Sequence, residues 1–217
     1  MPVRKIPKNH LHVTGGFAGR KNTRLVGYES PLEREYMLLL EFDPEVVSFE
    51  EQPVRISFLS EMGKKTPYVP DVLVHYHPPR PPELVEVKLA KDFKLKAKKF
   101  APKFKAAQQH ADERGWIFRK VSEKEIRGPY LQNLKFLREY RLVEPDLSML
   151  ERVLMAVGAA RRSLTVAGLI DQVTTSDDEK LIAFPALWHL VVSGRLRLNL
   201  NKPITSETRL SLPKERP

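Results

Sequence analysis

Three charged residues stand in segments that otherwise read as β-strands, within the stretch YVPDVLVHYHPPRPPELVEVKLA at residues 68–90. They are two acids, Asp71 and Glu86, and one base, Lys88. Two neighbouring carboxylates repel each other and tend to protonate unless a cation lies beside them. Oxygen ligands favour a hard ion such as Mg²⁺ or Mn²⁺, and a nearby lysine can offset charge that grows on a phosphate. This combination is typical of phosphodiester hydrolysis.

The three side chains can meet only if their two segments pair as a hairpin, and the proline-rich PPRPP segment predicts the reversal between them. Side chains alternate along a strand, so Glu86 and Lys88 share a face. One register pairs His75 with Glu86, and a slip of two residues sets Asp71 across from Lys88. Both registers place the three charges on one face, with diagonal neighbours about 7–8 Å apart. The alternative is a surface hairpin whose charges simply face water.

A basic stripe follows the hairpin and favours the first interpretation. The net charge is +10, and residues 1–144 carry 27 Lys and Arg against 19 Asp and Glu. Eight lysines and one acid lie between Lys88 and Lys105. Such a stripe indicates a polyanion, most commonly nucleic acid, although a solvated helix face is the alternative. We expect backbone contacts to DNA from five of these lysines: Lys91, Lys94, Lys96, Lys98 and Lys99.

The elements around these residues predict a mixed α/β domain. Residues 1–28 read as a basic, turn-rich arm. Ser30, Pro31 and Glu33 form a helix start with a capping box, and the helix should end before Pro44. Strands are predicted over 46–59 with a break at Pro53, 68–77, 83–90 and 116–123, and helices over 94–114, interrupted near Pro102, and 130–143. The expected fold class is α/β, a mixed sheet flanked by helices.

The rest of the chain predicts a second, smaller domain. The EPD segment at 144–146 reads as a joint, so the predicted domains are residues 1–144, with the basic N-terminal arm, and residues 145–217. Three helical patterns follow, and then RLRLNL and TRLSL alternate around NKPITSE as a hairpin would. Three helices and a β-hairpin indicate a winged-helix C-terminal domain.

Several stretches resemble one protein family. Pro70-Asp71 followed by Glu86-Val87-Lys88 is similar to the core of PD-(D/E)xK nucleases. This resemblance implies that the mixed sheet flanked by helices is restriction-endonuclease-like. More narrowly, residues 20–142 resemble the TnsA endonuclease subunit of heteromeric cut-and-paste transposases, whose C-terminal domain is also of winged-helix type. The stretches that carry this resemblance are YESPLEREYMLLLEFDPEVVSFEEQPVRI, YVPDVLVHY, LVEVKLA and YLQNLKFLREYR.

The resemblance implies a catalytic set of Glu33, Asp71, Glu86 and Lys88, with Mg²⁺ as cofactor and Mn²⁺ as a substitute. The metal ligands we expect are Asp71, Glu86, Val87 and Glu33. Glu33 has a rival role in the capping box with Ser30. Gln52 is not included in the catalytic set, because its side chain can hydrogen-bond either within the site or only to the chain at the strand break at Pro53.

The implied function is a Mg²⁺-dependent endonuclease that cuts DNA at transposon 5′ ends, on the non-transferred strand. The implied partners are double-stranded DNA at transposon ends, a TnsB-like transposase and a TnsC-like AAA+ ATPase regulator. The alternatives are a stand-alone restriction or repair nuclease and a non-enzymatic winged-helix DNA-binding regulator.

The amino-acid composition excludes several classes of function. The absence of cysteine excludes disulfides, thiolate catalysis and Cys-ligated zinc. No stretch of the sequence reaches the length needed to cross a bilayer, and the N-terminus lacks the apolar run of a signal peptide. We therefore expect a cytoplasmic protein with no membrane partner.

Overall fold

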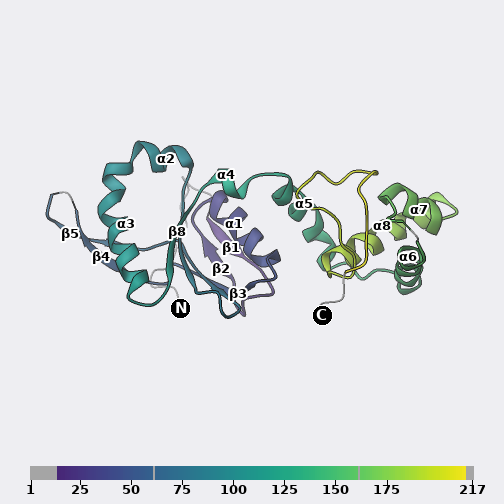
Figure 1. Cartoon of the computed structure of the whole chain (residues 1–217), viewed down its shortest axis with the longest axis horizontal. Helices are drawn as coiled ribbons and strands as arrows, with labels where there is room; N and C mark the ends of the chain where they lie inside the picture. The colour runs from purple at the N-terminus through teal and green to yellow at the C-terminus, as the bar shows by residue number, and fades with distance from the viewer. Residues whose placement is uncertain (1–13, 61, 161, 214–217) are drawn as a thin grey trace. The chain divides into compact units, whose positions relative to one another are not determined.

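The computed structural model describes residues 14–60, 62–160 and 162–213, and the chain divides into two compact units, Met1–Arg127 and Gly128–Pro217. Figure 1 shows the elements of each unit. Among the described helices, none combines the length and the apolar character that a membrane span needs.

Unit 1 is built on a four-stranded mixed sheet in the order β3-β6-β7-β8. Its strands are β3 (Val46–Glu51), β6 (Val72–Tyr76), β7 (Glu83–Val87) and β8 (Ile117–Val121). β6 pairs antiparallel with both β3 and β7, whereas β7 and β8 run parallel. Every residue of β7 is buried, which accounts for its largely apolar sequence ELVEV. The predicted mixed α/β sheet is confirmed.

Helices cover both faces of this sheet. Figure 1 shows α3 (Ala97–Asp112) on one side of β8 and α1 (Pro31–Phe42) on the other. Leu73 and Leu84 of the sheet form a core cluster with Ala107 of α3, while α1 packs on β3 and β7. The parallel pairing of β7 and β8 requires a crossover connection, which α2 (Ala90–Leu95) and α3 supply.

The bounds of α1 agree with the prediction, whereas the predicted interruption of the next long helix does not. Ser30 caps α1, because its hydroxyl accepts from the Glu33 amide, and the helix ends at Phe42 before Pro44, as predicted. The predicted interruption near Pro102 is wrong. The break lies at Lys96, between α2 and α3, and α3 continues through Pro102. A proline near the start of a long helix removes a single amide donor, which the remaining helix tolerates.

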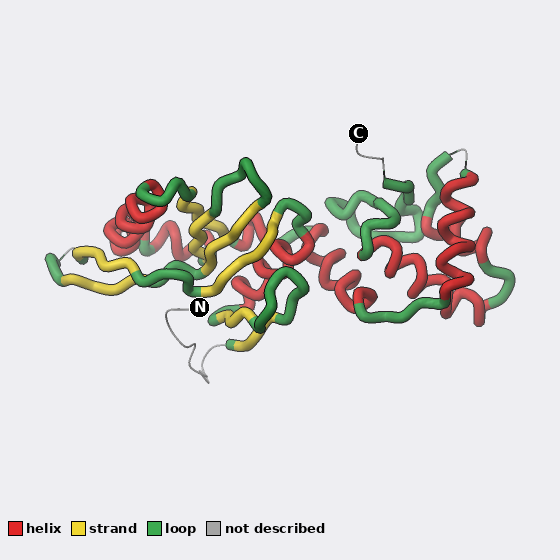
Figure 2. Tube along the Cα trace, turned by 90° about the horizontal axis from the view of Figure 1, so that it is seen from below, coloured by secondary structure: helices red, strands yellow, loops and turns green. Residues whose placement is uncertain are grey.

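Two small ladders complete unit 1. β1 (Gly15–Phe17) pairs with β2 (Val26–Tyr28), and Phe17 and Val26 are buried. The described part of the predicted arm, residues 14–28, is thus folded onto the unit; residues 1–13 of that arm lie outside the described residues. β4 (Ile56–Leu59) pairs with β5 (Lys65–Tyr68), and this ladder extends beyond the four-stranded sheet in Figure 2. A short helix, α4 (Glu123–Ile126), ends the unit.

Unit 2 is helical in its regular part. It contains α5 (Pro129–Arg138), the 3₁₀ turn η1 (Glu139–Arg141), α6 (Leu147–Ala159), α7 (Val166–Val173) and α8 (Asp177–Val192). The three helices predicted after the joint are present. The predicted hairpin after them is not a regular strand pair in the described chain: it is reduced to an isolated bridge between Arg197 and Ser211, beside another between Thr165 and Arg209. The winged-helix assignment therefore stays a prediction.

The division between the units falls earlier than the predicted boundary between residues 144 and 145. Helix α5 belongs to unit 2, where Leu137 joins its hydrophobic core. Asn133 is buried and its amide donates to the carbonyls of Leu200 and Lys202, each at 2.8 Å. The EPD segment breaks the helical pattern after α5. Helix α5 nevertheless packs in unit 2, together with the helices that follow that segment.

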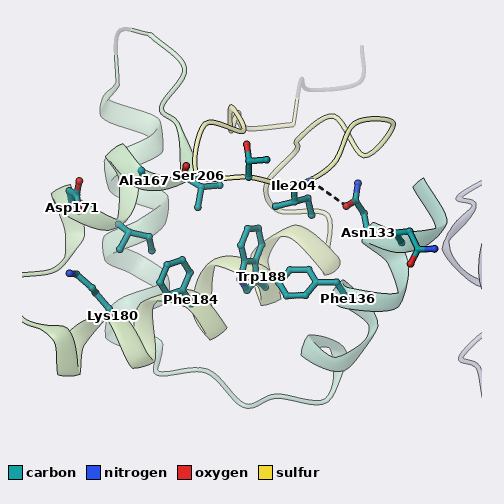
Figure 3. Close-up of a pocket in the computed structure, with 13 residues that line it drawn as sticks. Asn133, Phe136, Ala167, Asp171, Lys180, Phe184, Trp188, Ile204 and Ser206 are labelled. Carbon is teal, nitrogen blue, oxygen red and sulfur yellow. Dashed lines mark hydrogen bonds between the residues drawn. The ribbon is translucent and has the colours of Figure 1, made fainter. Parts of the chain in front are cut away.

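Unit 2 also contains a hollow of about 610 Å³. Figure 3 shows the aromatic side chains of Phe136, Phe184 and Trp188 along it, with Asp171 and Lys180 at one end. Ile204 borders the hollow and its amide donates to Asn133 at 3.3 Å. The lining is mainly apolar.

Candidate active site

The β6–β7 hairpin has neither of the two anticipated registers. Val72 pairs with Val85, and Val74 pairs with Glu83. The Asp71 amide donates to the Val85 carbonyl at 3.1 Å, just before β6 begins. The loop between the strands is longer than a tight proline reversal, which shifts the pairing. The shift keeps the parity of the register, so Asp71 and Glu86 still lie on one face of the sheet.

The structure brings Asp71, Glu86 and Lys88 together. The Lys88 ammonium lies 3.0 Å from Asp71 Oδ2 and 3.5 Å from Glu86 Oε1. It also donates to the Val87 carbonyl at 3.0 Å. Oxygen atoms of Asp71, Glu86 and Val87 thus face one positive charge.

Burial gives this cluster unusual protonation behaviour. Desolvation and the charge of Glu86 raise the pKa of Asp71 to about 8, against the lowering effect of Lys88. Burial alone would lower the pKa of Lys88, but the charges of Asp71 and Glu86 outweigh it and raise that pKa. Lys88 is therefore a permanent cation at neutral pH. Asp71 becomes a full anion there only if more positive charge is added.

Two residues that the sequence did not single out hold Glu86 in place. The Glu86 side chain is 1% exposed, the Tyr68 hydroxyl donates to its Oε2 at 2.7 Å, and the Lys103 ammonium donates to its Oε1 at 2.7 Å. Lys103 also lies 4.4–4.9 Å from the ring centres of Tyr68, Phe100 and Phe104. Lys103 is one of many lysines in its segment, and nothing in sequence separates it from the others.

A second buried acid on β7 provides a contrast. Glu83 accepts from the Tyr76 hydroxyl at 3.0 Å and pairs with Arg80 at 2.8 Å and Arg119 at 3.3 Å. Burial alone would raise the pKa of Glu83, but the hydrogen bonds from Arg80 and Tyr76 lower it. Two arginines satisfy Glu83, which marks it as structural. Asp71 and Glu86 have no arginine partner among the described residues.

Glu33 lies at the start of α1, where its carboxylate makes the hydrogen bonds of a helix cap. Its Oε2 accepts from the Glu29 amide at 2.7 Å and its Oε1 from the Ser30 hydroxyl at 2.9 Å. It is nevertheless near the cluster: burial raises its pKa, and the charge of Lys88 acts to lower it. Both roles predicted for Glu33 thus stay open, and in this structure its oxygens serve the cap.

Gln52 has a strained backbone beside the site. Its φ is 46°, in the left-handed region that non-glycine residues rarely occupy. Its backbone N–H donates to the Asp71 carbonyl at 2.9 Å, and its side-chain amide donates to the Glu29 carboxylate at 3.0 Å. Gln52 thus anchors the main chain next to Asp71.

A hollow of about 480 Å³ opens beside Asp71. Its polar border includes Gln52 and Glu29, and its apolar border includes Phe58 and Phe100. Three cations, Arg55, Lys99 and Lys103, also line it. The hollow therefore borders Asp71 and has basic and aromatic walls.

The five lysines of the predicted DNA-binding stripe are all exposed on α2 and α3 or at their junction. Lys96 pairs with Asp92 at 2.8 Å, and Lys99 alone of the five borders the hollow.

The donor set at the cluster fits a hard divalent cation. Asp71 and Glu86 supply carboxylate oxygens and Val87 a carbonyl oxygen, all within reach of the one point that the Lys88 ammonium occupies. The raised pKa of Asp71 indicates that this pocket is short of positive charge. In the described part of the chain, no three His, Cys, Asp or Glu side chains cluster as metal ligands, so Glu33 is not brought into the predicted set here.

Fold and site together define a nuclease-like α/β domain: a mixed sheet with an acid pair and a lysine on adjacent strands. Residues 43–123 match the family model described as TnsA-like endonuclease N terminal. The match contains Asp71, Glu86 and Lys88 and confirms the resemblance to TnsA-like endonucleases. It starts after Glu33 and ends before unit 2, so it bears on neither. No curated protein matches the chain.

Proposed function

We propose that the protein is the Mg²⁺-dependent DNA endonuclease subunit of a cut-and-paste transposase and hydrolyses phosphodiester bonds at transposon 5′ ends. The observation that carries the proposal is the convergence of Asp71, Glu86 and the Val87 carbonyl on one cation inside a segment that matches the TnsA-like endonuclease family. Mn²⁺, with the same preference for oxygen ligands, is expected to substitute.

Asp71, Glu86 and the Val87 carbonyl would hold the ion. When bound, the ion supplies positive charge at the phosphoryl group and makes a water molecule more acidic. The chain's own residues orient these groups: the Val87 amide donates to Asp71 Oδ2 at 2.7 Å, and Tyr68 and Lys103 fix Glu86. Positioning of this kind accounts for much of the rate in phosphoryl transfer.

Lys88 supplies a fixed positive charge to the reacting phosphate. Its side chain is 32% exposed, so its ammonium reaches the open side of the cluster. The raised pKa keeps the proton on Nζ at neutral pH, which favours stabilisation of charge on phosphate oxygens and argues against a role as proton acceptor. Glu33 is a further candidate in the catalytic set, through the family resemblance and its nearness to Lys88.

Unit 2 is the proposed site of protein contacts, with a TnsC-like ATPase regulator as the partner and a TnsB-like transposase acting beside it. Three helices followed by the Arg197–Ser211 bridge support a winged-helix arrangement with an irregular wing. The mainly apolar hollow beside Trp188 supports a protein partner more than a polyanion for this unit.

The test is cleavage of end-containing DNA with Mg²⁺, with and without the two partner proteins. We expect nicking at the 5′ ends by the wild type and its loss in Asp71→Ala, because one of the two carboxylates is removed. Asp112→Ala, at an exposed aspartate that ends α3, is the matched control and should nick normally.

Two outcomes would redirect the proposal. Robust cleavage without partners would indicate a stand-alone nuclease, and equal products from the wild type and Asp71→Ala would show that the cluster does not cut DNA.

A further inference from the structure

The hollow beside Asp71 contains two cations whose side chains make no ion pair or hydrogen bond with another described residue. They are Arg55, in the segment before β4, and Lys99, on α3. The other two lysines at the site are engaged: Lys88 with Asp71, and Lys103 with Glu86. Arg55 and Lys99 are thus not engaged by the carboxylates of the cluster, and their positive charge is left for a ligand.

The two cations belong to different walls of the hollow. Arg55 precedes the ladder of β4 and β5, whereas Lys99 is part of the crossover helix, and β4 packs on α3. Phe58 and Phe100, one from each wall, border the same space. The apolar rings lower the local dielectric constant, which strengthens the attraction between a cation and an anion in this space. Of the two acids at the border, Glu29 accepts a hydrogen bond from Gln52, and Asp71 pairs with Lys88.

We propose that this hollow is a binding subsite for one backbone phosphate next to the scissile phosphate, held between Arg55 and Lys99. The inference rests on the proposed function, because the ligand is a phosphodiester of the strand that is cut. Arginine binds phosphate through two parallel hydrogen bonds, while lysine acts as a point charge, so the pair both orients and attracts the anion. The subsite would set the position of the strand relative to Asp71, which borders the same hollow.

The subsite differs from the lysine stripe in what it predicts. The other four stripe lysines, which do not border the hollow, attract any phosphate, so their removal should weaken binding evenly along the strand. A two-sided subsite should recognise one phosphate of the strand. The experiment therefore uses full-length protein and synthetic end-containing duplexes in which one backbone phosphate at a time is replaced by an uncharged methylphosphonate.

The variants are Arg55→Ala and Lys99→Ala, with Lys105→Ala as the control, since Lys105 is exposed on α3 and does not border the hollow. On unmodified DNA, we expect Arg55→Ala and Lys99→Ala each to weaken binding about tenfold, as the loss of a charge-assisted hydrogen bond does. For both variants, this loss should disappear on the same single methylphosphonate duplex. The Lys105→Ala loss should be smaller and independent of the methylphosphonate position.

Two results would overturn the subsite. One is a loss that stays equal at every methylphosphonate position, and the other is a pair of separate positions for Arg55 and Lys99. Wild-type nicking with the partner proteins is measured on the same duplexes. If the wild type nicks but the two variants do not converge on one phosphate, the subsite is wrong and the proposed function stands; if the wild type never nicks, the proposed function itself fails.

Discussion

At the scale of single residues, Glu33 has two roles that one substitution separates. In Glu33→Gln, the side-chain oxygen can still accept one of the two cap hydrogen bonds, so the variant should lose about 1 kcal/mol of stability or less. If Glu33 is catalytic, nicking should be lost, because the carboxylate charge near Lys88 is gone. The measurements are a thermal unfolding curve and a nicking assay with Mg²⁺.

The control for Glu33 is Ser30→Ala, which removes the cap partner and leaves the carboxylate in place. It should lower stability by about 1 kcal/mol, as the loss of an N-cap does, and retain nicking. Normal nicking by Glu33→Gln would show that this residue is a helix cap and nothing more.

Tyr68 positions Glu86 and permits a closely matched comparison. Tyr68→Phe removes the hydroxyl that donates to Glu86 and keeps the ring beside Lys103. Loss of a partner that orients a metal ligand typically weakens metal binding about tenfold. We therefore expect the Mg²⁺ concentration for half-maximal nicking to rise by about that factor in Tyr68→Phe.

Tyr76→Phe is the control for Tyr68, because it removes the same group from another buried carboxylate on β7, Glu83. Both variants should lose stability, but only Tyr68→Phe should change the Mg²⁺ dependence. The same shift in both variants would mean that Tyr68 acts through stability alone.

The residue scale also shows what sequence reveals about a site. Asp71, Glu86 and Lys88 are recognisable because charge in a strand core is costly and needs a reason. Tyr68 and Lys103 carry no such signal: a tyrosine is ordinary in a strand, and Lys103 stands in a helix rich in lysine. Their role depends on how α3 packs on the sheet, which is a feature of the tertiary structure.

At the scale of elements, the start of α8 carries a pH-sensitive contact. Glu179 accepts from Arg152 at 2.9 Å and from the Thr175 amide at 2.5 Å, and these bonds lower the pKa of Glu179 to about 2. A carboxyl with a lowered pKa in the folded state stabilises that state above its ordinary pKa of about 4.3, and the stabilisation is lost as the pH falls toward 2.

Glu179→Gln removes the charge and keeps the shape of this side chain. Urea unfolding of unit 2 should show the wild type more stable than the variant at pH 6, with the difference shrinking by pH 3. The exposed neighbour Asp178, changed to Asn, should give a much smaller difference at both pH values. A constant gap between wild type and Glu179→Gln across this range would contradict the ionic origin of the contact.

Elements with strong local signals are where sequence-based prediction succeeded. The Ser30 cap and the stop before Pro44 fixed α1 within a residue, and the position of β7 followed from its apolar run. The register of the hairpin did not follow, because the loop between Tyr76 and Glu83 is longer than the tight proline turn that was assumed. The break at Lys96 in place of Pro102 did not follow either, because lysine is an ordinary helix residue and gives no sign of a helix end.

At the scale of the whole molecule, the position of the division between the units leads to a direct test. A fragment of residues 128–217 contains α5, whose Leu137 and Asn133 are buried in unit 2, whereas a fragment of residues 145–217 lacks it. We expect the longer fragment to unfold cooperatively in a thermal circular dichroism experiment. The shorter fragment should melt at a clearly lower temperature or without a sharp transition, because its core and the carbonyls of Leu200 and Lys202 lose their partners.

Equal melting curves for the two fragments would place the boundary at the EPD segment after all. The sequence pattern of α5 gave its amphipathic character correctly, with Leu131, Leu134 and Leu137 on one side. It could not reveal which unit that side joins, since an apolar face fits any core of suitable shape.

The crossover between β7 and β8 imposes one constraint on any redesign of this protein. The same run of chain that carries the exposed lysines also has to travel from one central strand to its parallel neighbour. Charges on its outer surface can be exchanged one by one, but the crossover cannot be replaced by a tight turn, because parallel strands need a connection of about a dozen residues or more.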